Sequence, residues 1–296
     1  MATAAGWGST VLGAVLVLLV LRDVVHTLWH PSGRRGLSRR LMTVLWRAGR
    51  ESRRRSGTGF LGGPLAMVVV ALSWVLLLVL GFTLVYWPHL PDAFVYGSGL
   101  APGRSGALDA VYLSLVTLAT LGFGDIVPES PWLRLAVPVE AVVGFVLLTA
   151  AVTWVLQVYP ALSRRRALAL RLALLRRAAL PAAAVGAGLL REIAVDLVQV
   201  RVDLTQHAET HYFRDVDPET ALPLQLPVAL ELAGAGGRSP DAQVRTAATF
   251  LGVALEDLTG VLDRQFLHRG GDVRARVAAY ADDHGHRLPG DPAVSW

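Results

Sequence analysis

Three long apolar stretches dominate the hydrophobic pattern of the chain. They run from Trp7 to Trp29, from Pro64 to Trp87 and from Trp132 to Tyr159. Each is long enough to supply the roughly 20 helical residues that cross a bilayer. The middle stretch has no charged residue and ends in Tyr86 and Trp87, which are typical of the headgroup interface. The pattern predicts an all-α membrane protein with three spans.

The first stretch is interrupted by charge. Its unbroken apolar run extends only from Val11 to Leu21, and Arg22, Asp23 and His26 follow. A cleaved signal peptide is the alternative to a retained helix, but no basic residue precedes the run and no small-x-small cleavage pattern follows it. We therefore expect an N-terminal transmembrane helix in residues 1–30. The polar residues would either contact the pore-forming spans or lie at the cytoplasmic interface.

Two arginine runs set the expected orientation. One lies within residues 34–55 and the other is Arg164 to Arg166. Cytoplasmic segments of membrane proteins are enriched in Lys and Arg, so we expect both runs inside the cell. This predicts a multi-pass protein of the plasma membrane with its N-terminus outside and everything after Tyr159 in the cytoplasm. An apolar face that includes Leu37 and Val44 allows the 34–55 run to lie on anionic lipid, with a solvated charge run as the alternative.

Overall charge and cysteine content exclude some classes. The net charge of +5 comes from arginines that flank apolar runs instead of forming a basic domain, so no nucleic-acid partner is expected. The chain has no cysteine, which excludes disulfides and cysteine metal sites.

A shorter apolar segment, Leu108 to Ala119, lies between the second and third spans. It leads directly into TLGFGD, which is Thr120, Leu121, Gly122, Phe123, Gly124 and Asp125. Because the segment is too short to cross, we expect a helix that re-enters the membrane and is followed by irregular backbone, which is tolerated only in protein or against water. Gly122 and Gly124 adopt backbone angles denied to other residues, so consecutive carbonyls can face one axis and replace the hydration shell of a cation.

The block Tyr112 to Pro128, YLSLVTLATLGFGDIVP, resembles the pore loop of the potassium channel superfamily, whose motif is T-x-G-Y/F-G-D. With Leu121 and Phe123 it is most similar to the second pore loop of animal two-pore-domain channels. The resemblance covers about residues 64–159 and implies a prokaryotic pore domain of two transmembrane helices and one pore loop, with an extra N-terminal helix. Ala119 and Val116 depart from residues that the family often carries there.

This resemblance also implies an ion and an assembly. K⁺ would be the permeant ion, held by the backbone carbonyls of Thr120, Leu121, Gly122 and Phe123, and no organic cofactor is expected. A pore of this family needs four loops and this chain has one, so the resemblance implies a homotetramer in the lipid bilayer.

Side chains around the loop have predicted supporting roles. Tyr112 is positioned to donate a hydrogen bond to Asp125 at the outer mouth, and Thr117 belongs to the same support. Glu140 lies in the outer half of the third span, where an ionised side chain usually faces protein or water. A contact with Ser114 or Thr117 would make Glu140 a gating or proton-sensing group, and a water-exposed vestibule is the alternative.

The third span also carries gating candidates. The resemblance places Gly144 at the inner-helix hinge, with close helix packing as the alternative role. It places Leu148, Val152 and Leu156 toward the axis, where an apolar constriction closes by dewetting, with contact to lipid as the alternative. No span carries arginines at every third position, so steep voltage gating is not expected.

The rest of the chain reads as helices. We expect a basic cytoplasmic linker at 31–60, the pore domain at 61–160, a helical cytoplasmic domain at 161–284 and a flexible tail at 285–296. Within the cytoplasmic domain, a break is expected at Pro181 and a long helix from Ser239, its N-cap, to His268. No nucleotide fingerprint or catalytic motif is met, so no enzyme is predicted.

One amphipathic stretch from Leu190 continues with three- and four-residue steps through His207 and His211. In a four-stranded assembly these histidines would form rings and a pH switch. With Glu209, Asp215 and Asp217 nearby they would instead bind a divalent ion. Partly exposed helix histidines are the default.

The expected function is that of a passive, potassium-selective channel subunit. One alternative is a weakly selective cation channel on the same scaffold. Another is a membrane receptor or metal-binding protein that uses the helix of His207 and His211.

Overall fold

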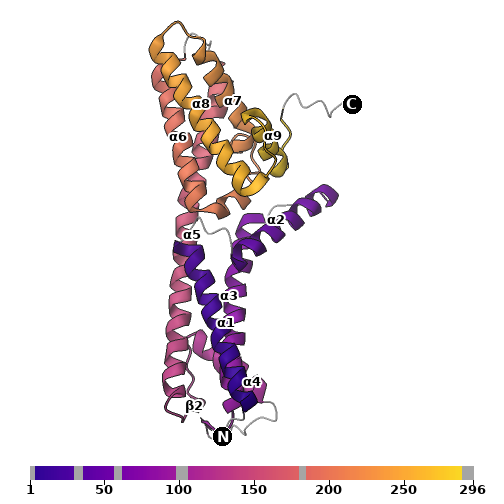
Figure 1. The fold of residues 1–296 in the computed structure, drawn as a ribbon, viewed down its shortest axis with the longest axis vertical. Helices are drawn as coiled ribbons and strands as arrows, with labels where there is room; N and C mark the ends of the chain where they lie inside the picture. The colour runs from indigo at the N-terminus through magenta and orange to yellow at the C-terminus, as the bar shows by residue number, and fades with distance from the viewer. Residues whose placement is uncertain (1–3, 30–35, 57–61, 98–105, 180–184, 289–296) are drawn as a thin grey trace. The chain divides into compact units, whose positions relative to one another are not determined.

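The computed structural model describes residues 4–29, 36–56, 62–97, 106–179 and 185–288 (Figure 1). It is all-α apart from one short pair of strands, as the sequence predicts. The chain divides into two compact units, Met1–Leu41 with Met67–Leu156, and Met42–Ala66 with Gln157–Trp296.

Three of the described helices are long and apolar enough to cross a membrane: α1 (Ala4–Trp29), α3 (Gly62–Tyr86) and α5 (Leu133–Ala178). They coincide with the three predicted spans. α5 continues far beyond the expected end of its span at Tyr159, because the alanine, leucine and arginine that follow are strong helix formers. The predicted break at Pro181 lies outside the described residues, as do residues 289–296 of the predicted tail.

Small residues bring α1 close to α3 within the first unit. A Cβ added to Gly13 would collide with the carbonyl oxygen of Gly81, and one added to Gly81 would lie 2.7 Å from Cγ2 of Val17. The Ser9 hydroxyl donates a hydrogen bond to the Leu84 carbonyl over 2.9 Å. In lipid, such close approach and interhelical hydrogen bonds hold helices together.

Asp23 of α1 is bonded to the middle of α3 and to the start of α2. The indole N–H of Trp74 in α3 donates to Asp23 Oδ2 over 2.9 Å, and the backbone N–H of Leu37 donates to Oδ1 over 2.8 Å. The Ser38 hydroxyl also donates to this carboxylate. Asp23 therefore satisfies free amides at the start of α2 (Leu37–Ser56), where the helix dipole favours negative charge. The polar contact that the sequence allowed for Asp23 is made with Trp74.

A short antiparallel pair of strands, which the sequence did not predict, closes the loop region of the first unit. β1 (Phe94–Tyr96) pairs with β2 (Ile126–Pro128), with Phe94 opposite Pro128 and Tyr96 opposite Ile126. The backbone N–H of Gly97 donates to the carbonyl of Asp125 over 2.8 Å. The pair therefore fixes the segment that follows TLGFG to the loop after α3.

The second unit is a helical bundle with its own core. Four helices, α6 (Ala187–Gln206), α7 (Leu222–Gly237), α8 (Ala242–Leu262) and α9 (Val273–Asp283), surround it together with the last turns of α5 (Figure 1). A 3-10 helix, η3 (Ala208–Tyr212), follows α6, and a π-helical turn, η4 (Asp263–Leu267), follows α8. The fully buried leucines of this core are Leu172, Leu190, Leu197, Leu226, Leu251 and Leu255.

Helix α8 starts later than the sequence predicted. Its N-cap is Asp241, which accepts a hydrogen bond from the backbone N–H of Gln243 over 2.8 Å. The expected N-cap, Ser239, instead accepts from the backbone N–H of Asp241 over 3.2 Å in the preceding turn. Ser and Asp are both good N-caps. Asp241 takes this role because it stands directly before Ala242, the first residue of the helix.

The arginine run after the third span is paired with buried carboxylates. Arg164 binds Asp203 through two nitrogens, over 2.7 and 2.8 Å. Arg165 and Arg166 bind opposite oxygens of Asp215, over 2.8 and 2.6 Å. Arg165 and Asp215 are only 5% and 6% exposed. Two carboxylates therefore neutralise part of the positive charge that the predicted topology depends on.

Replacing Asp215 by alanine is expected to destabilise the second unit by about 3–5 kcal/mol, since it leaves the buried Arg165 without its counter-ion. Chemical denaturation of the purified chain, followed by circular dichroism, measures this. Asp196→Ala is the matched control, because Asp196 and its partner Arg171 have side chains 39% and 35% exposed and such pairs contribute less than about 1 kcal/mol. Equal, small losses in the two variants would contradict the prediction.

Candidate functional site

Helix α4 (Gly106–Leu118) ends one residue before Thr120 to Gly124, which we call the filter segment after the role that the sequence predicts for it. The backbone amides at the start of this segment turn back to the last turn of α4. The N–H of Leu121 donates to the Val116 carbonyl over 2.9 Å, and the N–H of Thr120 to the Thr117 carbonyl over 2.9 Å. These amides are thus satisfied within the chain, whereas no backbone amide of the described residues donates to the carbonyls of the segment.

Backbone handedness alternates along the filter segment. Thr120, Gly122 and Gly124 have φ angles of 58°, 55° and 74°, whereas Leu121 and Phe123 between them are outside the positive-φ region. Where the sign of φ alternates in this way, successive carbonyls can face the same side. A row of carbonyl dipoles facing one side is a binding surface for a dehydrated cation.

Asp125, which follows the filter segment, is bonded to Tyr112, the predicted donor. The Tyr112 hydroxyl donates to Asp125 Oδ2 over 2.5 Å, and the backbone N–H of Ile126 donates to Oδ1 over 3.2 Å. Thr117 is 5% exposed in the last turn of α4, where its carbonyl accepts the Thr120 amide.

The apolar side chains of the filter segment are uncovered in a single chain. Leu121 is 60% and Phe123 65% exposed. In a membrane protein, large apolar side chains that find no cover in their own chain contact either lipid or another protein chain.

Glu140 of α5 lies behind α4 in a fully buried polar cluster. Its carboxylate accepts hydrogen bonds from the Ser114 hydroxyl and the Tyr86 hydroxyl, each over 2.6 Å. All three residues are 0% exposed. Of the two positions that the sequence allowed, the structure shows the contact with Ser114, and the water-exposed vestibule position is wrong. The cluster ties α3, α4 and α5 together, as is usual for an ionisable side chain inside a membrane.

Tyr86 is a member of this cluster that the sequence analysis missed. Its place at the end of an apolar span indicated an interfacial aromatic, which is the common role. A buried tyrosine hydroxyl nevertheless needs a partner, and the carboxylate of Glu140 was the signal that one was available.

The predicted gating residues of α5 differ in exposure: three apolar side chains are exposed, and the glycine is buried. Leu148, Val152 and Leu156 are 65%, 52% and 67% exposed in the single chain, so they form a face that is open to an axis or to lipid. Gly144 is buried, and a Cβ added to it would collide with the carbonyl oxygen of Leu118 in α4. Close packing therefore accounts for this glycine, and α5 is one continuous helix through it.

His207 and His211 do not share a helix face. α6 ends at Gln206, His207 is its C-cap, and His211 lies on η3. The predicted stripe therefore stops at Leu204. His207 Nδ1 is 3.7 Å from Glu209 Oε1, whereas His211 Nε2 is 3.1 Å from Asp283. Asp215, a predicted metal ligand, is engaged by Arg165 and Arg166.

Comparison with known proteins finds a similarity for one segment of the chain. Residues 72–159 match a family described as "Ion channel". The chain is also 27% identical over 164 residues to the uncharacterized membrane protein YdjJ of Bacillus subtilis (strain 168), a match that covers 55% of this chain and 47% of the relative. The chain thus spans about half the length of that relative. No solved structure matches.

The matched residues contain most of α3, all of α4, the filter segment and α5 as far as Tyr159. They therefore hold the filter segment, the Glu140 cluster and the exposed face of α5 with Leu148, Val152 and Leu156. The similarity to the ion channel family is therefore confined to the segment that carries this geometry.

Proposed function

We propose that the chain is one subunit of a homotetrameric, potassium-selective channel. The observation that carries this proposal is the alternating backbone of Thr120 to Gly124, with its first amides bonded to α4. Four such rows of carbonyls around an axis offer a dehydrated K⁺ ion the oxygen ligands that replace its water shell. The carbonyls of Thr120, Leu121, Gly122 and Phe123 are the proposed ligands. We expect passive transport and no enzymatic activity.

The homotetramer is supported by what one chain lacks. A single filter segment supplies one row of carbonyls, and a closed ion path of this kind needs four. Leu121 and Phe123 are exposed in the isolated chain. Burial of these two side chains against neighbouring copies, together with fourfold symmetry about the axis, meets both needs.

The proposed orientation in the membrane follows from the two arginine runs, within residues 34–55 and at Arg164 to Arg166. We propose that the protein lies in the plasma membrane with its N-terminus and Asp125 outside and the second unit in the cytoplasm. Helix α2 exposes Leu37 and Val44, which are 47% and 60% exposed, beside the exposed Arg40 and Arg47. A helix that exposes apolar and cationic side chains together on one face suits the surface of anionic lipid.

Behind the filter segment, we propose that the buried cluster of Glu140, Ser114 and Tyr86 supports the pore. It holds α4 against α3 and α5 immediately before the irregular backbone begins. Leu148, Val152 and Leu156 are the proposed apolar lining of the inner pore, where closure by dewetting requires such side chains.

Reconstitution into liposomes tests the proposal. We expect K⁺ flux from the purified chain and a reversal potential that follows the K⁺ gradient when K⁺ and Na⁺ are opposed across the membrane. A reversal potential near zero in opposed K⁺ and Na⁺ would identify the weakly selective cation channel instead. No flux from protein that elutes as an assembled oligomer would contradict both readings.

A further inference from the structure

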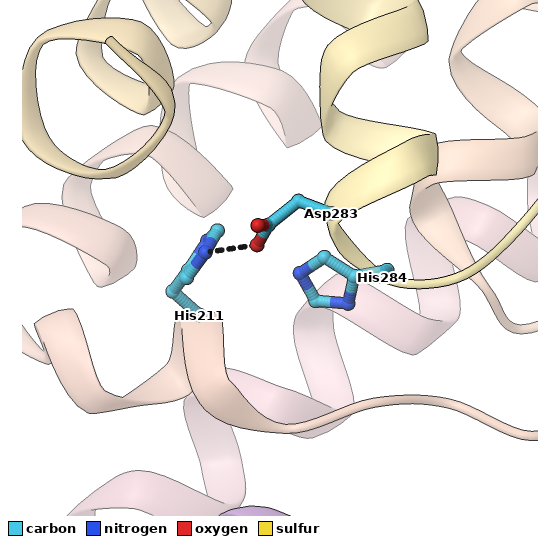
Figure 2. Close-up of side chains that lie close together, drawn as sticks. All are labelled: His211, Asp283 and His284. Carbon is cyan, nitrogen blue, oxygen red and sulfur yellow. Dashed lines mark hydrogen bonds and ion pairs between the residues drawn. The ribbon is translucent and has the colours of Figure 1, made fainter. Parts of the chain in front are cut away.

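Three potential metal ligands meet at one point of the second unit. His211 comes from η3, Asp283 ends α9 and His284 is the C-cap of α9. One ligand atom from each lies within 4.8 Å of the others. Figure 2 shows both imidazoles with a ring nitrogen turned toward the Asp283 carboxylate. His211 and His284 are each 1% exposed.

These donors form a recognisable set. Two imidazole nitrogens and one carboxylate oxygen suit borderline divalent ions such as Zn²⁺, with water in the fourth position. His211 Nε2 and Asp283 Oδ2 are already 3.1 Å apart, close to the roughly 3.3 Å between neighbouring ligand atoms of a tetrahedral zinc site. We propose that His211, Asp283 and His284 bind a divalent transition-metal ion of the Zn²⁺ class.

The rings around the cluster hold the two histidines in place. Phe266 of η4 stacks on His211, with ring centroids 4.0 Å apart and planes at 11°. Tyr280, one turn before His284, lies edge-on to it with centroids 4.7 Å apart. Trp46 lies 5.1 Å from His284 by the same measure. Side chains locked by packing are oriented before the ion arrives, which favours binding.

The carboxylate is ionised and already bonded to helix α2. Burial raises the pKa of Asp283, but the hydrogen bond and charge of His211 and the charge of Arg50 outweigh it and hold the pKa below its ordinary value. Trp46 donates its indole N–H to Oδ2 over 3.0 Å, and Arg50 pairs with Oδ1. A metal ion would take Oδ2 from Trp46 and leave Oδ1 to Arg50.

Metal binding and the attachment of α2 are therefore coupled. Occupancy of the site exchanges one hydrogen bond of α2, from Trp46, for a metal–oxygen bond. The charge of Arg50 opposes the incoming cation, so we expect an affinity that responds to changes in metal supply and not a permanently filled structural site. The site would thus act as a metal-dependent release for α2.

Titration of the full-length protein in detergent with Zn²⁺ tests this, with bound metal counted by mass spectrometry and Co²⁺ absorption as a report on ligand type. We expect one ion per chain in the wild type and an affinity more than about 100-fold lower in His284→Ala. His207→Ala is the matched control, because His207 is only four residues from His211 yet lies outside the cluster. It should bind as the wild type does.

Asp283→Asn is a second variant that keeps the shape of the side chain, and it is expected to lose at least about tenfold in affinity. It decides the question if His284→Ala fails to fold. Hydrogen exchange in α2 should increase when Zn²⁺ is added to the wild type and stay constant in Asp283→Asn. The proposal is overturned if the wild type shows no saturable binding, or if His207→Ala loses the metal while Asp283→Asn keeps it.

Discussion

Gly122→Ala is expected to abolish K⁺ flux while the assembled oligomer survives. Gly122 has a φ angle of 55°, and an L-residue pays roughly 1–2 kcal/mol for the left-handed conformation. Four copies in one ring bring the cost to about 4 kcal/mol or more, which lowers the population of the conducting backbone by roughly a thousandfold. No atom lies within 4 Å of the added Cβ in the chain, so we expect the chain to fold.

Thr120 also has a positive φ angle although it is not a glycine. The hydrogen bonds of the two residues explain why Gly122 should be more sensitive to substitution. The Thr120 amide is anchored to the Thr117 carbonyl over 2.9 Å, whereas the Gly122 amide reaches the Val116 carbonyl only over 3.4 Å. The longer hydrogen bond of Gly122 stabilises its left-handed conformation less. Alanine at position 122 should therefore leave this conformation, and its peptide carbonyl should turn away from the proposed pore axis. Without the alternating sign of φ, each filter segment would lose one of its proposed carbonyl ligands.

Flux from liposomes measures this effect, and size-exclusion chromatography measures assembly. Gly8→Ala in α1 is the matched control, since Gly8 has no left-handed angle and no atom within 4 Å of an added Cβ. Its flux should equal that of the wild type. Normal conduction by Gly122→Ala would remove the basis for assigning the filter segment.

The sequence predicted those contacts of the site whose residues lie close together along the chain. TLGFG and the short apolar helix before it are contiguous, and Tyr112 and Asp125 are separated by 13 positions. Their arrangement follows from one helix and one turn. The Glu140 cluster joins positions 54 apart, and only its link to Ser114 was anticipated, because apolar periodicity does not show which helices are neighbours.

The cytoplasmic helices show the same limit. The stripe from Leu190 predicted α6, but no local signal separated Leu204 from His207. The helix ends at Gln206 because His207, with φ −129° and ψ 70°, leaves the helical conformation before η3 begins. α7 was missed since Pro227 lies inside it, and proline argues against a helix interior. Asp283 and His211 are 72 positions apart, so their meeting depends on the whole bundle.

Helix α4 is held to the rest of the first unit in two ways. Tyr112 and Ser114 bond to Asp125 and Glu140, and at the C-terminal end of the helix the Leu118 carbonyl packs against Gly144 of α5. Leu118 stands two residues before the filter segment. A change at Gly144 should consequently reach the filter segment through the backbone, without touching a proposed ion ligand.

Gly144→Ala is expected to lower the stability of the first unit by up to about 3 kcal/mol and to reduce K⁺ flux. The added Cβ meets the carbonyl oxygen of Leu118, and overpacking of this kind costs roughly 1–3 kcal/mol. Because the obstacle is backbone, no side chain can rotate to relieve it, so α4 or α5 must shift. We expect the oligomer to dissociate at a lower temperature in detergent.

The control for this effect is Gly252→Ala on α8, where no atom lies within 4 Å of an added Cβ and alanine favours the helix by about 1 kcal/mol. It should keep full flux and lose no stability. The comparison also separates the two roles of Gly144. If the glycine served only as a hinge, alanine would change opening and leave the dissociation temperature unaltered. A lower dissociation temperature means that α5 needs glycine there to approach α4, whether or not the helix also bends.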